Sequence, residues 1–162
     1  MVGGPAADIR KSYTPGPVGL MSRSGGMTTE IANLLTVAGL GQSTCISVGG
    51  DPVVGSQFVD FLELFEADEE TRALVLFTEP GGSMETVLAA RLREKPSRLP
   101  LFCFIAGRFA DNMRGVRFGH AATLVASEAD TTAAKTTLLR EAGVDVVEDL
   151  SMLPVRVRQA LV

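Results

Sequence analysis

The single histidine of the sequence, His120, is the side chain best suited to carry a phosphoryl group. An imidazole with an ordinary pKa of about 6.5 is largely neutral in a cell, and the neutral ring is a nucleophile. His120 follows a glycine within residues 113–122, a stretch that does not read as the apolar face of a helix. A lone histidine is often only a surface or packing residue, so the interpretation of His120 depends on the segments around it.

Residues 16–25, GPVGLMSRSG, run from a short apolar stretch into the expected start of a helix. In Ser24-Gly25-Gly26 the first backbone N–H groups of that helix are free to face an anion, and the helix dipole adds about +0.5 charge there. Together with His120, this anion cradle (residues 24–26) suggests phosphoryl transfer through a histidine. The alternative is that Ser24 or Thr28 simply caps the helix.

Two more turns combine glycine with polar side chains. Residues 49–55, GGDPVVG, could hold a carboxylate or phosphate on backbone N–H groups, because glycine lets a ligand approach the main chain. A tight turn capped by Asp51 is the alternative. In residues 79–82, EPGG, Glu79 follows an apolar stretch, and beside an imidazole its carboxylate would fix the tautomer and orientation of the ring. The alternative for Glu79 is a solvated turn residue.

The elements that must position these turns alternate between strand and helix. Short apolar runs predict buried strands at 18–22, 43–48, 73–77, 101–105 and 144–147. Helical spacing of apolar residues predicts helices at 28–38, 58–65, 84–92, 132–142 and 150–161.

This alternation predicts an α/β fold with a flavodoxin-like, doubly wound parallel five-stranded sheet. In such sheets ligands bind beyond the carboxyl ends of the strands. The three turns and the segment that bears His120 are therefore expected to meet at one edge of the sheet.

Length and composition restrict the class of protein. The 162 residues indicate one domain, with residues 1–15 as an irregular amino-terminal arm and residues 16–162 as the folded domain. A net charge of −4 without a basic cluster argues against nucleic-acid binding. No apolar run reaches the roughly 20 residues that span a bilayer, and no signal-peptide pattern opens the chain. Cys45 and Cys103 lie in apolar runs without zinc-site spacing, which indicates buried free thiols, no metal site and a cytoplasmic location.

Six stretches of the sequence resemble the carboxyl-terminal ligase domain of the succinyl-CoA synthetase α subunit. That acid–CoA ligase family also includes ATP-citrate lyase and malate–CoA ligase. The stretches are, in the family's order, GPVGLMSRSGGMTTE, GLGQSTCISVGGDPVVGSQFVDFLELFEAD, EPGGSMET, FIAGR, RFGHA and LLREAGVDVVEDL. They are spread over most of residues 16–150, and the second is highly specific.

The resemblance implies roles for individual residues. His120 matches the histidine that is transiently phosphorylated, and Glu79 matches the carboxylate that orients it. The positions that match the family's phosphate-binding helix start are Ser22, Ser24 and Gly25. Gly49 and Gly50 match a turn near the organic acid and the thioester chemistry.

The resemblance also implies partners. In the family, ATP or GTP with Mg²⁺ phosphorylates the histidine, the phosphoryl group passes to the acid, and CoA then displaces phosphate. The sequence shows neither an ATP-grasp region nor a CoA-binding domain, so an ATP-grasp β-type subunit and a CoA-binding domain are expected as partners, in an assembly that can be oligomeric. Two alternatives stay open: a non-catalytic, ligase-derived module that binds a partner, and a domain excised from a longer α-type subunit.

Overall fold

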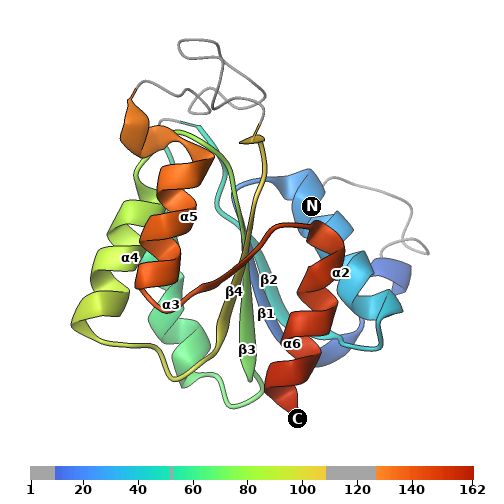
Figure 1. Ribbon diagram of the computed structural model, residues 1–162. Coiled ribbons are helices and arrows are strands. Elements are labelled where there is room, and N and C mark those ends of the chain that lie inside the picture. Colours follow the sequence, from blue (N-terminus) through green and yellow to red (C-terminus); the bar gives the residue numbers. More distant parts are fainter. Residues whose placement is uncertain (1–9, 52, 109–126) are drawn as a thin grey trace.

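In the computed structural model, which describes residues 10–51, 53–108 and 127–162, five parallel strands form one sheet with helices on both faces (Figure 1). The strands are β1 (Pro15–Ser22), β2 (Gln42–Ser47), β3 (Ala73–Thr78), β4 (Leu101–Ile105) and β5 (Asp145–Val147). Their order in the sheet is β2-β1-β3-β4-β5. This is the flavodoxin-like order, so the predicted doubly wound α/β fold is confirmed.

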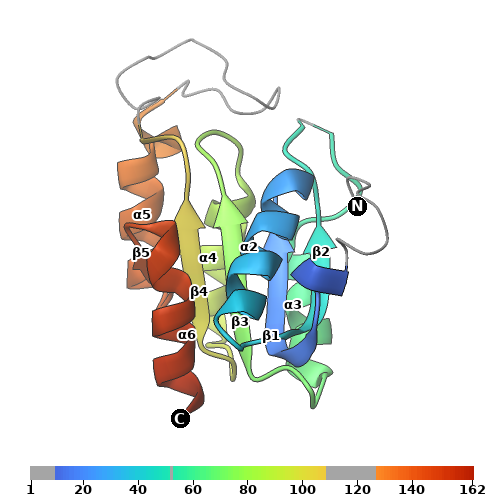
Figure 2. The ribbon, with the colours of Figure 1, turned by 90° about the vertical axis from the view of Figure 1, so that its right-hand side faces the viewer.

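The helices form a layer on each face of the sheet. Helices α3 (Phe58–Ala67), α4 (Met84–Glu94) and α5 (Thr132–Glu141) cover one face, and α2 (Gly25–Val37) and α6 (Leu153–Leu161) cover the other (Figures 1 and 2). Short 3₁₀ turns, η2 (Glu128–Asp130) and η3 (Leu150–Met152), precede α5 and α6.

The turn η3 stands where the sequence predicts the first turn of the last helix. The Ser151 N–H donates to Asp149 Oδ1 at 2.8 Å, which caps this tighter turn. Helix α6 itself begins at Leu153, next to Pro154. Proline suits the first turn of a helix because it lacks an N–H and its φ is fixed near the helical value.

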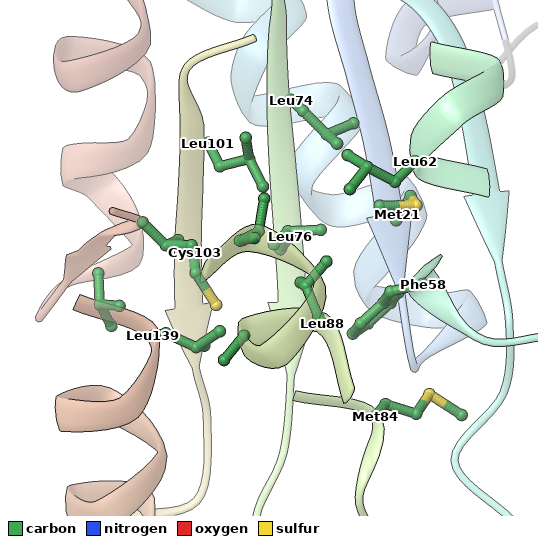
Figure 3. Packing of buried hydrophobic residues seen from close by; sticks show 14 of the residues in the cluster. Met21, Phe58, Leu62, Leu74, Leu76, Met84, Leu88, Leu101, Cys103 and Leu139 are labelled. Carbon is green, nitrogen blue, oxygen red and sulfur yellow. The ribbon is translucent and has the colours of Figure 1, made fainter. Parts of the chain in front are cut away.

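The two helical layers bury separate halves of the core, because successive strand residues point to opposite faces of a sheet. Leu74 and Leu76 of β3 pack in the cluster that contains Leu88 of α4 (Figure 3). Val75 and Phe77, between and after them, pack in the cluster formed with α2 and α6. Every residue of β3 is buried, as expected for a central strand covered on both sides.

Both cysteines lie in the described residues and both are free, as the sequence predicts. Cys103 of β4 is fully buried, whereas Cys45 is only partly buried because β2 is an edge strand. Burial raises the pKa of the Cys45 thiol to about 12 and raises the pKa of the Cys103 thiol as well. Neither thiol is therefore a nucleophile near neutral pH.

Part of the expected irregular arm is ordered. Residues 10–12 are helical, and β1 begins at Pro15, three residues before the predicted start. The Thr36 hydroxyl donates to the Ser12 carbonyl at 2.9 Å, and the Tyr13 hydroxyl lies 3.0 Å from Thr29 Oγ1. These contacts attach the segment to α2. Of the four residues that suggest an irregular arm, Pro15 begins β1, whereas Gly3, Gly4 and Pro5 lie outside the described residues.

Four strands end close together, at what we call the carboxyl edge. Ser22 of β1 pairs with Ser47 of β2 on one side and with Phe77 of β3 on the other, and Phe77 pairs with Phe104 of β4. The arrowheads of the strands accordingly point to the same end of the molecule (Figure 2). The turns that follow β1, β2 and β3 therefore open on this edge, as predicted.

Candidate functional site

The β1–α2 turn is closed by two serine hydroxyls. Ser22 is fully buried, and its Oγ donates to the Ser24 carbonyl at 2.7 Å and accepts from the Ser24 N–H at 3.0 Å. Ser24 is the N-cap of α2, and its Oγ accepts from the Met27 N–H at 3.4 Å. Ser24 therefore caps α2, and its role in binding an anion stays a prediction. The Ser24 side chain does not use the N–H groups of Gly25 and Gly26. These two groups have no acceptor within α2 either, because they lie in its first turn.

The β2–α3 turn contains a glycine that the backbone requires. Gly49 has a φ of +88°, in the left-handed region that favours glycine, and Gly50 is buried. Asp51 does not cap the helix, because α3 begins at Phe58 with Gln57 as its N-cap. The Gln57 N–H donates to Asp60 Oδ2 at 2.7 Å instead.

The β3–α4 turn, residues 79–83, carries the predicted orienting carboxylate. Glu79 is partly buried at the end of β3, so it is not a fully solvated turn residue. Gly81 and Gly82 have φ values of +75° and +69°, which lets two consecutive residues reverse the chain before α4.

A buried ionic cluster, Arg23, Glu85 and Lys135, lies under this turn. The side chains of all three are at most 2% exposed. Glu85 Oε2 lies 2.5 Å from Lys135 Nζ, and Glu85 Oε1 lies 3.4 Å from Arg23 Nη1 and accepts from the Thr78 hydroxyl. The cluster therefore contains two cations and one carboxylate.

The two cations also bind the main chain of the turn. Arg23 Nη1 donates to the carbonyls of Glu79 at 2.8 Å and Gly81 at 2.9 Å. Lys135 Nζ donates to the Glu79 carbonyl at 3.3 Å, to the Gly82 carbonyl at 3.2 Å and to the Gly81 carbonyl. Burial lowers the pKa of the Lys135 ammonium, and the Glu85 carboxylate opposes that shift.

Sequence reasoning missed this cluster. Its only signal is charged residues at buried positions of amphipathic helices: Lys135 lies four residues before buried Leu139, and Glu85 lies three residues before buried Leu88. Charges at such positions are usually solvated by snorkelling, so the pattern alone does not separate a buried cluster from a surface pair.

The structure brings the three predicted turns together. Arg23 belongs to the β1–α2 turn and contacts the β3–α4 turn, so these two turns are directly joined. The β2–α3 turn lies beside them, since the Val48 N–H donates to the Ser22 carbonyl at 2.8 Å. His120 lies outside the described residues.

A cavity of about 550 Å³ runs along the edge strand β2. Its lining includes Tyr13, Gln42 and Cys45, and it reaches the start of α2 at Gly25 and the end of β2 at Ser47. The β3–α4 turn does not contribute to this lining. The cavity therefore borders the anion cradle at Gly25 but not the turn that carries Glu79.

The comparison that decides the family is the match of residues 21–145 to the CoA-ligase family model. This match covers more than half of the chain and includes all three predicted turns. The chain belongs to the CoA-ligase family. The resemblance noted from the sequence is thereby confirmed at the level of the family.

Similar curated proteins agree with this membership. The chain is 43% identical over 151 residues to the α subunit 1 of succinate–CoA ligase (ADP-forming) of Archaeoglobus fulgidus, which covers 93% of this chain and 50% of that protein. It is 40% identical over 137 residues to the α subunit of malate–CoA ligase of Methylorubrum extorquens, covering 85% of this chain and 45% of that protein. The chain thus spans about half the length of the curated relatives it matches.

A solved structure has the same fold. The chain superposes with a TM-score of 0.89 and 31% identity on a mutant ATP citrate lyase of Methanosaeta concilii in complex with (3S)-citryl-CoA. The superposition covers 97% of this chain and 26% of that chain. In the described residues of the present CoA-ligase chain, no helix is long and apolar enough to cross a membrane.

Proposed function

We propose that this chain is the phosphoryl-carrying domain of a nucleotide-dependent acid–CoA ligase, as in the succinate–CoA ligase α subunits to which it is similar. The observation that carries the proposal is the contact between the β1–α2 turn, which includes the anion cradle, and the β3–α4 turn, which carries Glu79, at the junction of β1 and β3. This is where the strand order reverses, and such switch points are the ligand sites of doubly wound sheets. Membership of the CoA-ligase family supports the same chemistry.

In the proposed reaction, the neutral imidazole of His120 attacks the terminal phosphoryl group of ATP or GTP, and the nucleoside diphosphate leaves. The Glu79 carboxylate orients the ring, and the turn formed by Ser22, Ser24 and Gly25 receives the phosphoryl group. The carboxylate of the organic acid, near Gly49 and Gly50, then takes the phosphoryl group and frees His120. Finally the CoA thiol, on losing its proton, attacks the acyl carbonyl and phosphate leaves.

The proposed chemistry requires partners. A phosphoryl group carries close to two negative charges, whereas one helix start offers about +0.5. A second helix start from another subunit would balance more of this charge. We infer an ATP-grasp β-type subunit that brings nucleotide and Mg²⁺, and a CoA-binding domain; the similar succinate–CoA ligase proteins are named as α subunits, which supports a partner subunit. The two free cysteines support a reducing compartment such as the cytoplasm.

The test is phosphorylation of the protein purified with its native partners at neutral pH. After incubation with γ-labelled ATP or GTP, we expect one acid-labile phosphoryl group on the peptide that contains His120. His120→Asn should abolish the label, and Glu79→Gln should reduce its rate of formation at least tenfold. Glu30→Gln, an exposed carboxylate on α2, is the matched control and should leave the label unchanged.

The same preparation separates the alternative of a non-catalytic module. Such a module would carry no phosphoryl group, and His120→Asn would leave the activity of the assembled complex intact. Either result would contradict the proposed function.

A further inference from the structure

The β3–α4 turn is held in place by side chains on its buried side. The carbonyls of Glu79, Gly81 and Gly82 all accept hydrogen bonds from Arg23 or Lys135. The Gly81 N–H donates to the Asp130 carbonyl at 3.0 Å, which attaches the turn to η2 as well. The path of the main chain that carries Glu79 is therefore set by two cations that come from other elements.

Buried ions are a costly way to fill this space. Well-packed apolar side chains are often as stabilising as a buried ion pair, because the charges lose their hydration. Apolar side chains, however, cannot donate hydrogen bonds to the carbonyls of the turn. The cluster therefore supplies something that apolar packing would not, namely a fixed geometry for residues 79–82.

Arg23 connects this geometry to the anion cradle. Its side chain reaches the Glu79 and Gly81 carbonyls, while its main chain lies between Ser22 and Ser24. Its backbone N–H donates to the Phe77 carbonyl at 3.1 Å, which joins the ends of β1 and β3. Arg23 thus directly precedes the cradle in the sequence and holds the neighbouring turn.

We propose that Arg23 and Lys135 are positioning residues, with Glu85 as their shared counter-ion, that hold the Glu79 turn at a fixed place beside the anion cradle. This inference rests on the proposed function. Neither side chain needs to touch the reacting atoms: each acts through the carbonyls of the turn. Phosphoryl transfer should then depend on these buried cations even though nucleotide binding does not.

The first test compares Lys135→Met with Arg140→Met in the protein assembled with its native partners. Arg140 lies on the same helix with a side chain 50% exposed, so it is the matched control. In Lys135→Met we expect amide hydrogen exchange to rise at least tenfold in the peptide that covers residues 79–87 and to stay unchanged in that covering residues 49–57. The phosphorylation rate at saturating nucleotide should fall at least tenfold with KM changed less than twofold. Lys135→Arg should restore part of that rate.

A second variant leaves the ions in place and guards against a misfolded Lys135→Met. Gly82→Ala adds a Cβ at a φ of +69°, with the Arg23 guanidinium 3.5 Å away, and should give the same local exchange and the same loss of rate. Gly39→Ala imposes the same backbone strain at a φ of +72°, with nothing within 4 Å of the added Cβ. It should change neither readout.

The outcomes separate the two proposals. A complex that takes up no phosphoryl group disproves the proposed function, and the exchange comparison still decides whether Lys135 holds the turn. A complex that is phosphorylated normally in both Lys135→Met and Gly82→Ala overturns the positioning role. Amide hydrogen exchange that rises throughout the molecule in both variants, with no recovery of the phosphorylation rate in Lys135→Arg, indicates general destabilisation. That result would overturn the positioning role too.

Discussion

At the scale of single residues, Glu85 shows how position in the fold changes the meaning of a charge. It is a carboxylate in the first turn of α4, where acidic residues commonly interact with the helix dipole at the surface. Here it is buried and meets Arg23 and Lys135, which are 62 and 50 residues away in the sequence. The pairing depends on tertiary structure alone.

Asp68, at the end of α3, links stability to pH. The Thr71 hydroxyl donates to its carboxylate at 2.5 Å and the Glu70 N–H donates at 3.1 Å, and these bonds lower the pKa of Asp68 below the ordinary 3.8. The folded state therefore favours the ionised form. Its contribution to stability is complete well above pH 3.8 and is lost as pH falls through the lower pKa of the folded protein.

We therefore expect Asp68→Asn to be less stable than the unmodified protein at pH 7, with a difference that shrinks as the pH falls below 3.8. Urea unfolding at pH 7 and pH 3 measures the two differences. Equal differences at both pH values would contradict the role of the ionised carboxylate.

At the scale of elements, the approach of α3 to β1 depends on one missing side chain. A Cβ at Gly19 would lie 2.7 Å from the ring of Phe65 and 2.9 Å from Leu74 Cδ1. Both neighbours are buried, with Phe65 only 3% exposed. Even a methyl group at Gly19 would therefore force the Phe65 ring, the Leu74 side chain or α3 itself to shift.

We expect Gly19→Ala to destabilise the protein by about 1–3 kcal/mol, as overpacking of a core does. Gly55→Ala is the control: an added Cβ there meets nothing within 4 Å, and the change should be neutral or stabilising by up to about 1 kcal/mol. Urea unfolding measures both. Phe65→Leu should recover part of the loss in Gly19→Ala, and no such recovery would argue against the steric cause.

The sequence predicted the elements well because each strand and helix has a local pattern. The apolar runs at 73–77 and 101–105 became β3 and β4 with bounds shifted by at most one residue. The position of Glu79 followed from the end of β3 in the same way. The contacts that hold Glu79 could not be predicted. In the sequence, Arg23, Glu85 and Lys135 look like ordinary surface residues, and only tertiary packing brings them together.

At the scale of the whole molecule, an arginine also connects the loops at the opposite end of the sheet. We call this end the amino edge because the strands begin there. Arg98, in the loop before β4, donates to the carbonyls of Asp68 at 2.8 Å and Phe65 at 3.3 Å, and to that of Glu66. It also reaches the Thr71 carbonyl at 3.4 Å, just before β3. Unlike Arg23, it is an exposed residue.

Arg98→Met should therefore lower the free energy of unfolding by about 1–3 kcal/mol, as loss of hydrogen bonds to a charged group does. The phosphorylation rate at saturating nucleotide should not change, because the amino edge lies at the far end of the strands from the proposed site. Urea unfolding and the labelling experiment test the two statements separately. A slower rate in a folded Arg98→Met protein would show that the two edges are coupled.

The ionic cluster under the Glu79 turn has a further consequence for the order of assembly. Residues 23 and 85 leave the ribosome well before residue 135, and domains are made from the amino terminus onward. Until α5 docks, the Glu85 carboxylate has only one of its two cations, and the turn lacks three of the five hydrogen bonds that the two cations donate to its carbonyls. The turn that carries Glu79 therefore reaches its full set of contacts only after α5 has been made, and a chain truncated before α5 would lack the contacts of Lys135 altogether.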